Sequence, residues 1–166
     1  LTDWMDVHVR VLFAHTPSGF LTHAPGSARF FLGRTATGNL WRVRADVPSG
    51  SAARLTELAA DEPVAEPAEF PRHAGAYARI LEESGPIQRR WTGPAYHFPA
   101  VIPTTDHRVV QITESNIDLL NANHRDWIPD VGVGDPVCAL LIDGAITSIC
   151  FRAAMSDVAF EAGVDT

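Results

Sequence analysis

The sequence predicts an α+β protein, and three patterns of residues support this prediction. Apolar and alternating runs over residues 7–44 are typical of β-strands. Leucine, isoleucine and tyrosine residues at helical spacing follow, over residues 52–60 and 72–83. Near the end of the chain, two apolar runs flank Asp143-Gly144, which is a strong hairpin signal.

Length and composition describe an ordinary globular chain. It has 166 residues, of which 46% are hydrophobic and 20% are charged, so it is long enough to bury a core without staples. The net charge of −7 argues against a nucleic-acid partner, which requires a basic face. No apolar run approaches the roughly 18 residues of a membrane span, and the N-terminus lacks the apolar region of a signal peptide. We expect a cytoplasmic protein with no membrane partner.

The N-terminal third is expected to be strand-rich. Val7–Phe13 mixes alternation with an apolar run, and we predict a strand there. Phe30–Arg34 and Leu40–Arg44 flank Thr37-Gly38-Asn39 and predict a second hairpin. The strand over 40–44 alternates between apolar and basic residues, as expected of a strand with one solvated face.

Two helices and an acidic linker are predicted next. Pro48-Ser49 precedes a helix over Ala52–Ala60, and a second helix over Arg72–Glu83 ends near Gly85-Pro86. The prolines and acidic residues of 61–71 predict a solvated surface linker, with attraction of a cationic acceptor as the alternative. Its acidic residues are Asp61, Glu62, Glu66 and Glu69.

The stretch 91–103 is rich in proline and aromatic residues and is predicted to be extended. We interpret the large aromatic residues around it as core or interdomain packing, with the lining of an acceptor pocket as the alternative. These residues are Trp91, Tyr96, Phe98 and Trp127.

The last third has the most regular pattern. Thr113–Asn116 offers a cap for a helix that holds Ile117 and Leu120. Three strands are predicted over Val137–Ile142, Ala145–Ala153 and Val158–Val164. Both faces of the first two strands are apolar, so we expect this hairpin to be covered on both sides.

The two cysteines flank the predicted Asp143-Gly144 turn. If Ile142 pairs with Ala145 in an uninterrupted ladder, Cys138 lies opposite Ile149 and Cys150 opposite Val137. The thiols then lie on different faces of the sheet, and we predict core cysteines without a disulfide. Cys150 and Ser148 lack a recognisable catalytic partner in the sequence and are also interpreted as packing residues.

No metal site is predicted. The seven histidines show neither HxxxH spacing nor a cysteine at ligand spacing. They are His8, His15, His23, His73, His97, His107 and His124.

The predicted hairpin and the strand after it carry a family resemblance. The segment 136–150 (PVCALLIDGAITSIC) resembles the second and third strands of GNAT-superfamily N-acetyltransferases, and 161–166 (EAGVDT) is similar to their fourth strand. Residues 91–99 (WTGPAYHFP) and 30–35 (FFLGRT) resemble a bacterial subfamily with an extra N-terminal region. The resemblance implies a strand-rich region with two helices over 1–100. Over 101–166 it implies the first half of a GNAT-like mixed sheet with flanking helices.

The resemblance also implies a chemistry, the transfer of acetyl from acetyl-CoA, as cosubstrate, to a small-molecule amine. On the fourth strand Glu161 is the implied catalytic base, with a solvated carboxylate or an ion pair to Arg152 as the alternative. The backbone around Val164, Asp165 and Thr166 is the implied cofactor-binding segment, since its N–H groups polarise the thioester carbonyl.

In this family a Gly/Arg-rich turn and a helix follow the fourth strand, and their N–H groups hold the pyrophosphate of acetyl-CoA. The sequence stops at Thr166, before such a turn. We therefore expect weak activity or none from this chain, and either a shortened gene or a natural noncatalytic remnant accounts for the stop.

The alternative function belongs to another class. A noncatalytic module derived from a GNAT fold would bind a ligand or another protein. The edge strand 158–164 would then support a homodimer or strand exchange, because exposed sheet edges recruit partners.

Overall fold

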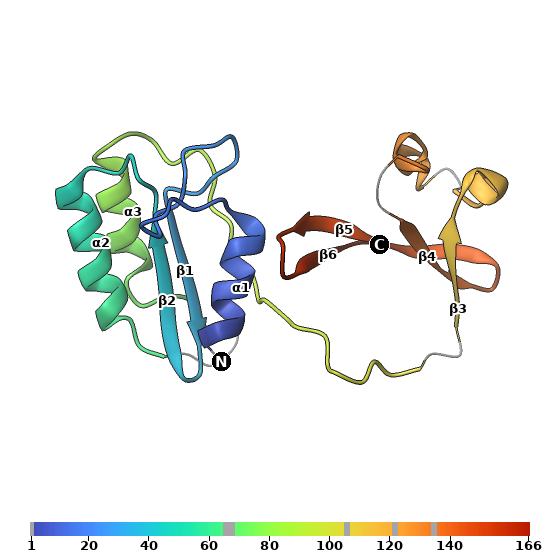
Figure 1. Ribbon diagram of the computed structural model, residues 1–166, viewed down its shortest axis with the longest axis horizontal. Coiled ribbons are helices and arrows are strands. Elements are labelled where there is room, and N and C mark those ends of the chain that lie inside the picture. Colours follow the sequence, from blue (N-terminus) through green and yellow to red (C-terminus); the bar gives the residue numbers. More distant parts are fainter. Residues whose placement is uncertain (1, 65–68, 105–106, 121–122, 134–135) are drawn as a thin grey trace. The chain divides into compact units, whose positions relative to one another are not determined.

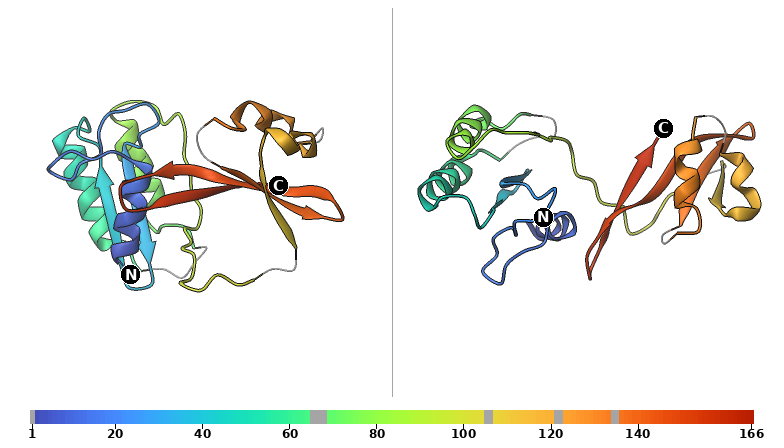
Figure 2. Two further views of the ribbon diagram at one scale, coloured as in Figure 1. Left: turned by 45° about the vertical axis from the view of Figure 1, so that its right-hand side comes forward. Right: turned by 90° about the horizontal axis from the view of Figure 1, so that it is seen from above.

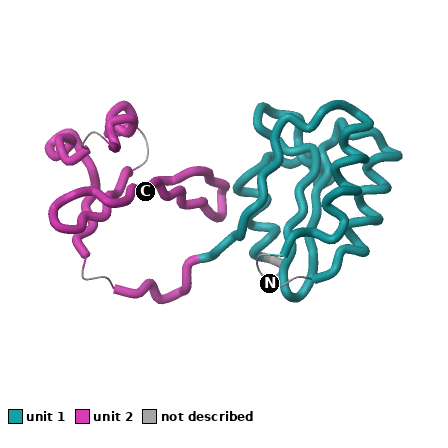
Figure 3. The backbone as a smooth tube through the Cα atoms, turned by 180° about the vertical axis from the view of Figure 1, so that it is seen from behind, with its two compact units in different colours: residues 1–97 teal, residues 98–166 magenta. Residues whose placement is uncertain are grey.

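The computed structural model describes residues 2–64, 69–104, 107–120, 123–133 and 136–166. The chain divides into two compact units, Leu1–His97 and Phe98–Thr166 (Figure 3). Both units combine helices with antiparallel strands, which confirms the predicted α+β class.

Unit 1 is a three-layer arrangement around a two-stranded sheet. Helix α1 (Thr2–Leu12) covers one face of the hairpin formed by β1 (Phe30–Thr35) and β2 (Gly38–Val43), and two further helices cover the other face (Figures 1 and 2). These two helices, α2 (Ser49–Asp61) and α3 (Ala74–Glu82), lie side by side.

The strand predicted over Val7–Phe13 is wrong, because most of this segment belongs to α1. A short apolar run does not distinguish a strand from a buried helix. Val9 lies one helical turn from Met5 and is fully buried. On the same helix, Asp6 and Arg10 form an i,i+4 ion pair at 2.7 Å.

The predicted hairpin of unit 1 is confirmed, with its turn shifted toward the N-terminus. Thr35 pairs with Gly38, which leaves Ala36-Thr37 as a two-residue turn. The Thr35 hydroxyl accepts hydrogen bonds from the N–H groups of Thr37 and Gly38, and it donates to the Gly38 carbonyl at 2.7 Å. This side chain closes the turn, so Gly38 and Asn39 extend β2.

Both predicted helices of unit 1 are confirmed, with ends shifted by one to three residues. Their apolar faces meet the hairpin in one hydrophobic cluster that includes Val43, Leu55, Tyr77 and Ile80. The Phe30 and Tyr77 rings lie 5.0 Å apart between their centroids within it.

Unit 2 is a four-stranded antiparallel meander in the order β3-β4-β5-β6. Strands β4 (Val137–Ile142), β5 (Ala145–Met155) and β6 (Phe160–Asp165) confirm the three predicted strands. Strand β3 (Arg108–Ile112) was not predicted from the sequence. Val158 belongs to the preceding turn rather than to β6, because Ser156 closes that turn through its backbone N–H to the Ala159 carbonyl at 2.8 Å.

Two short 3-10 helices, η1 (Glu114–Leu119) and η2 (Arg125–Asp130), connect β3 to β4. The predicted cap is confirmed: Thr113 and Asn116 form a reciprocal capping box at the start of η1. Both helices pack on one face of the sheet, where the core holds Ile112, Ala139, Leu141 and Ile149 among others.

The turn between β4 and β5 has the predicted two-residue form. Asp143 and Gly144 both have positive φ angles, 51° and 82°, as a primed hairpin turn requires. The ladder then departs from the predicted register. Leu141 pairs with Ile146, but Leu140 pairs with Ser148, so Thr147 is an extra residue in a β-bulge.

The structure overturns three predictions about this hairpin, the first of them because of the bulge. It places Cys138 directly opposite Cys150, so the thiols share one face of the sheet instead of lying on different faces. That face is not the core face, because Cys138 is half-buried and Cys150 is exposed. Nor is the hairpin covered on both sides by the described part of unit 2, since η1 and η2 pack on the opposite face. We call the face that carries Cys138, Cys150 and Val164 the open face.

Candidate functional site

The predicted site residues Glu161, Val164, Asp165 and Thr166 lie on or directly after β6. Along a strand, neighbouring side chains point to opposite faces. Glu161 and Asp165 therefore lie on the same face as Gly163, while Val164 lies on the open face and is 64% exposed. Thr166 follows the strand and is exposed.

Trp127 of η2 ties this segment to the rest of unit 2. Its indole ring packs on Phe151 of β5, with 4.5 Å between the ring centroids. Its Nε1–H donates to Oδ2 of Asp165 at 2.8 Å. Trp127 is half-buried and belongs to the border of the core, which agrees with its interpretation as a packing residue.

Gly163 is needed where the Phe151 ring crosses β6. It pairs with Phe151 in the ladder, and a Cβ at this position would overlap the Phe151 ring. The strand therefore approaches the aromatic pair closely on the face where Glu161 and Asp165 project.

The Glu161 side chain is half-buried, and its backbone pairs with Ala154 of β5. Across the described ranges of the chain, its carboxylate makes no hydrogen bond or ion pair. Asp165 differs, because its carboxylate already accepts the Trp127 hydrogen bond. The structure thus brings the carboxylates of Glu161 and Asp165 to one face, and of these two only Asp165 has a hydrogen-bond partner among the described residues.

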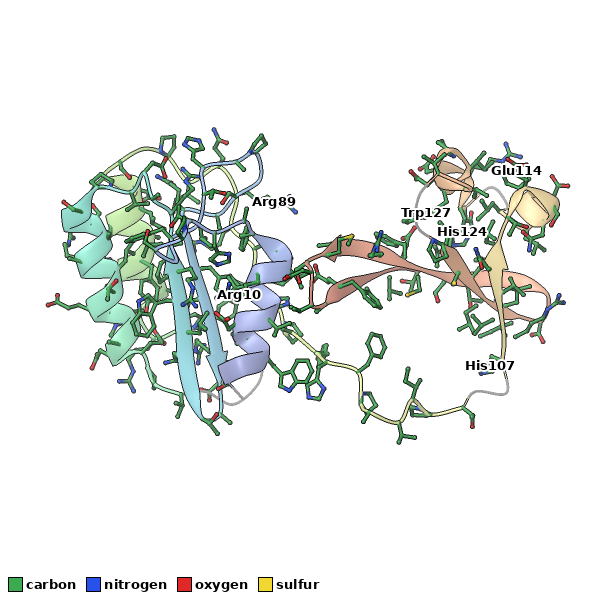
Figure 4. All side chains as sticks on the ribbon, in the orientation of Figure 1. Arg10, Arg89, His107, Glu114, His124 and Trp127 are labelled. Atoms are coloured by element: carbon green, nitrogen blue, oxygen red, sulfur yellow. The ribbon has the colours of Figure 1, made fainter. Side chains whose placement is uncertain are left out.

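His124 is a polar group near the site that sequence reasoning did not single out. It precedes η2 directly, is only 7% exposed, and its Nδ1 atom has no hydrogen-bond partner among the described residues. Figure 4 shows His124 and Trp127 close together in unit 2, and the backbone N–H of Trp127 donates to the His124 carbonyl at 3.2 Å. No spacing in the sequence marks this histidine, since its burial depends on contacts made by the folded chain.

Unit 1 contains a second cluster of polar groups, around Glu62. The sequence predicted a solvated carboxylate, but Glu62 is only 4% exposed. Its two carboxylate oxygens accept hydrogen bonds from the backbone N–H groups of Arg72 and His73 and from the Tyr77 hydroxyl, at 2.5, 3.1 and 2.9 Å. Asp61 and Glu69 are exposed, as predicted, and Glu66 lies outside the described residues.

Burial raises the pKa of Tyr77 well above its usual value, and the hydrogen bond to Glu62 and the charge of that carboxylate act in the same direction. The phenol therefore stays protonated and keeps donating to Glu62. Since all three donors are engaged by one carboxylate, this cluster holds α3 in place and offers no free group for chemistry.

An open groove lies between α2 and α3. Charged residues of both signs line it, including Arg54, Glu57, Asp61 and Arg79. At one end Arg54 and Glu83 form an exposed ion pair at 2.7 Å. The mixture of charges gives the groove no preference for an anion or a cation.

The aromatic residues before β3 do not pack into a core. Trp91, Tyr96 and Phe98 are exposed, Tyr96 by 89%, so core packing is wrong for these three residues, while interdomain packing stays a prediction. Their segment has neither helix nor strand in the described range 86–104.

Two further observations concern metals and membranes. No group of three or more His, Cys, Asp and Glu residues with the geometry of a metal site exists within the ranges that the structure describes. Of the helices in those ranges, none combines the length and apolar character that crossing a bilayer requires.

Comparisons of this chain with protein-family models, with curated proteins and with solved structures find no match.

Proposed function

We propose that unit 2 is the first part of a GNAT-type domain and that it serves acetyl transfer from acetyl-CoA to an amine. The order of its elements supports this proposal. Two helical turns precede a tight antiparallel hairpin, and a strand that carries Glu161 follows. The resemblance of 136–150 and 161–166 to the family implies this order of elements, within a GNAT-like mixed sheet.

The free carboxylate of Glu161 is the observation that carries the proposal. An attacking amine must lose a proton when it forms a bond to the acetyl carbon. In this proposal the Glu161 carboxylate on β6 accepts that proton directly or through water. The thioester carbon–sulfur bond breaks, and the CoA thiolate departs. Backbone N–H groups of the segment Val164–Thr166 stabilise the negative charge on the carbonyl oxygen.

The edge of β6 suits the pantetheine arm of the cosubstrate. In the described part of unit 2, β6 is paired only with β5. An extended arm can form hydrogen bonds with the backbone groups of the other edge, as a peptide does when it adds to a sheet.

The first test is a calorimetric titration of this chain with acetyl-CoA, with CoA alone as the control ligand. Micromolar binding supports the proposal. No binding at millimolar ligand rejects acetyl transfer for this chain, and leaves the noncatalytic module as the remaining candidate.

Glu161→Gln tests the role of the carboxylate. We expect acetyl transfer to a panel of amines, followed by mass spectrometry of the acetylated product, to fall by about 100-fold or more, while acetyl-CoA affinity is retained. Asp157→Asn is the matched control, because Asp157 is an exposed carboxylate in the preceding turn. If the unchanged protein shows measurable turnover, an equal rate in Glu161→Gln would exclude Glu161 as the base.

A noncatalytic binding module is the second candidate, and the open face of unit 2 favours it. Met155, Phe160 and Val164 are large apolar residues in this part of the sheet, and each is more than half exposed. Such a surface is typical of sites that meet another protein.

A further inference from the structure

The two cysteines occupy facing positions on neighbouring strands. Cys138 of β4 and Cys150 of β5 are Cα partners in the ladder. This arrangement depends on the bulge at Thr147, since an uninterrupted ladder would place Cys138 opposite Ile149. The extra residue therefore brings the two thiols to the same face, whereas an uninterrupted ladder would place them on opposite faces.

Facing positions on antiparallel strands suit a disulfide. Directly opposed residues have Cα atoms about 4.5 or 5.5 Å apart, according to the type of pair, and a disulfide accepts Cα separations of about 4.4–6.8 Å. The Cβ atoms of such pairs lie about 4.5–5.5 Å apart, so closure needs only a small approach toward the roughly 3.8 Å of a disulfide.

Closing this bridge leaves the core of unit 2 in place. The core residues of β4 and β5 are Val137, Ala139, Leu141, Ile146 and Ile149, which project from the other face. On the open face the pair is flanked by Gln111 of β3 and Val164 of β6, its next partners across the sheet. Cys150 is exposed and Cys138 half-buried, so reagents in solution reach the pair.

We propose that Cys138 and Cys150 are a reversible dithiol–disulfide pair that responds to small-molecule disulfides. One cysteine thiolate attacks a sulfur of the external disulfide, forms a mixed disulfide and releases one small thiolate. The second cysteine thiolate then attacks the protein sulfur of the mixed disulfide and releases the other small thiolate. The protein loses two electrons and two protons, which reduce the external disulfide to two thiols.

The bridge fastens β4 to β5 on the side of the bulge away from the Asp143-Gly144 turn. It closes residues 138–150 into a ring, so the register that contains the bulge is held covalently while the pair is oxidised. Reduction returns the register to the control of hydrogen bonds and packing alone. This inference does not depend on the proposed acetyl transfer.

The test exposes the reduced chain to mixtures of oxidised and reduced glutathione, blocks remaining thiols with an alkylating reagent, and measures intact mass. We expect a species lighter by two hydrogen atoms, without an accumulated glutathione adduct, that a dithiol reductant reverses. Cleavage before Asp143, which lies between the cysteines, should leave the two fragments joined until reduction. Cys138→Ser and Cys150→Ser should each accumulate one glutathione adduct instead.

The double variant S148C/C150S is the matched control. It keeps two cysteines on the same strands and the same face, but residue 148 pairs with Leu140 and lies diagonal to Cys138. Diagonal positions are about 7–8 Å apart, so we expect the fraction of bridged protein at a given glutathione ratio to fall at least 10-fold. A second pair, L140C/S148C in a C138S/C150S background, faces directly and should form the bridge.

Two results would overturn the inference. One is that the protein without substitutions retains free thiols or stable glutathione adducts at glutathione ratios at which L140C/S148C is bridged. The other is a diagonal control that forms the bridge as readily as the native pair, since bridging would then owe nothing to the register.

Discussion

Glu62 lies at the end of α2, and its carboxylate fastens that end to the start of α3. It accepts two backbone N–H groups from the entry to α3, which would otherwise lack partners within the helix. It also accepts the Tyr77 hydroxyl from one turn inside α3. A negative charge at this end of a helix is further stabilised by the helix dipole.

Glu62→Gln is expected to lower the free energy of unfolding by about 1–3 kcal/mol. The amide keeps the shape of the side chain, but its NH₂ group faces a backbone donor that loses its acceptor. Urea unfolding followed by circular dichroism measures the difference. Glu82→Gln, an exposed residue on α3, should change stability little, and equal effects of the two changes would contradict the role of Glu62.

Because of Tyr77, we expect the folded state of unit 1 to lose stability in alkaline solution. Its pKa is raised in the folded unit, whereas an unfolded chain ionises tyrosine near pH 10. The unfolded state therefore releases the proton first, and folded stability, complete below about pH 10, falls as the pH rises beyond it. The chain has no lysine that would titrate in the same range.

We expect the urea midpoint of unit 1 to fall as the pH rises above about 10, and this fall to be smaller in Tyr77→Phe. Tyr96→Phe serves as the control, because Tyr96 is the other tyrosine of the chain and is almost fully exposed. A midpoint that declines equally in both variants would remove Tyr77 as the cause.

At the scale of elements, the contact of α1 with the hairpin depends on a missing side chain. A Cβ at Gly33 of β1 would overlap the Met5 side chain of α1. The Phe13 ring, just beyond α1, meets Phe31 of the same strand edge-on, with 6.0 Å between the centroids. The helix therefore rests on β1 through close contact at Gly33 and aromatic contact beside it.

Gly33→Ala is expected to destabilise unit 1 by about 1–3 kcal/mol through overpacking. Met5→Ala in the same background should recover part of the loss, because it removes the overlapping atoms. Gly75→Ala is a control of opposite sign: a Cβ there meets nothing within 4 Å, and alanine favours a helix by about 0.5–1 kcal/mol. Chemical denaturation of the four proteins measures these differences.

The elements that the sequence predicted are those whose signals are local. Asp143-Gly144 requires positive φ angles, which few residues adopt, and Thr113 with Asn116 forms its cap within four residues. The Val7–Phe13 prediction failed because a run of apolar residues fits both a strand and a buried helix. Strand β3 was missed because its five residues, RVVQI, are too short and too mixed to stand out.

The errors at the site have a different cause, because they depend on contacts distant in sequence. The donors to Glu62 lie ten to fifteen positions along the chain, and Trp127 meets Asp165 across 38 positions. The bulge did leave a local trace. Ile146 and Ile149 are both buried but three residues apart, a spacing that a regular strand does not allow on one face.

At the scale of the whole molecule, the chain contains two units, each with a hydrophobic cluster of its own. The described residues of unit 2 leave the open face uncovered and leave the outer edges of β3 and β6 unpaired. Exposed strand edges pair readily with a second chain, so the homodimer expected from the sequence remains a proposal for the edge of β6.

Light scattering at increasing protein concentration is expected to show a shift from monomer to dimer. Phe160→Lys, which adds a charge to the exposed side of β6, should weaken this association, whereas Val133→Lys in an exposed loop should not. Protection of β6 amides from hydrogen exchange in the dimer would assign the contact to the edge. A chain that stays monomeric at every concentration would contradict the proposal.

The bulge at Thr147 makes unit 2 sensitive to a class of genetic change that surface strands usually tolerate. Loss of the single codon for residue 147 would remove no buried side chain. Every later position of β5 would nevertheless move from the core face to the open face, or the reverse, unless the strand shifted its pairing with β4. Ile149 would then move outward, and Cys150 would point inward. We therefore expect related sequences to differ often in the residue at this position, but rarely in the number of residues here.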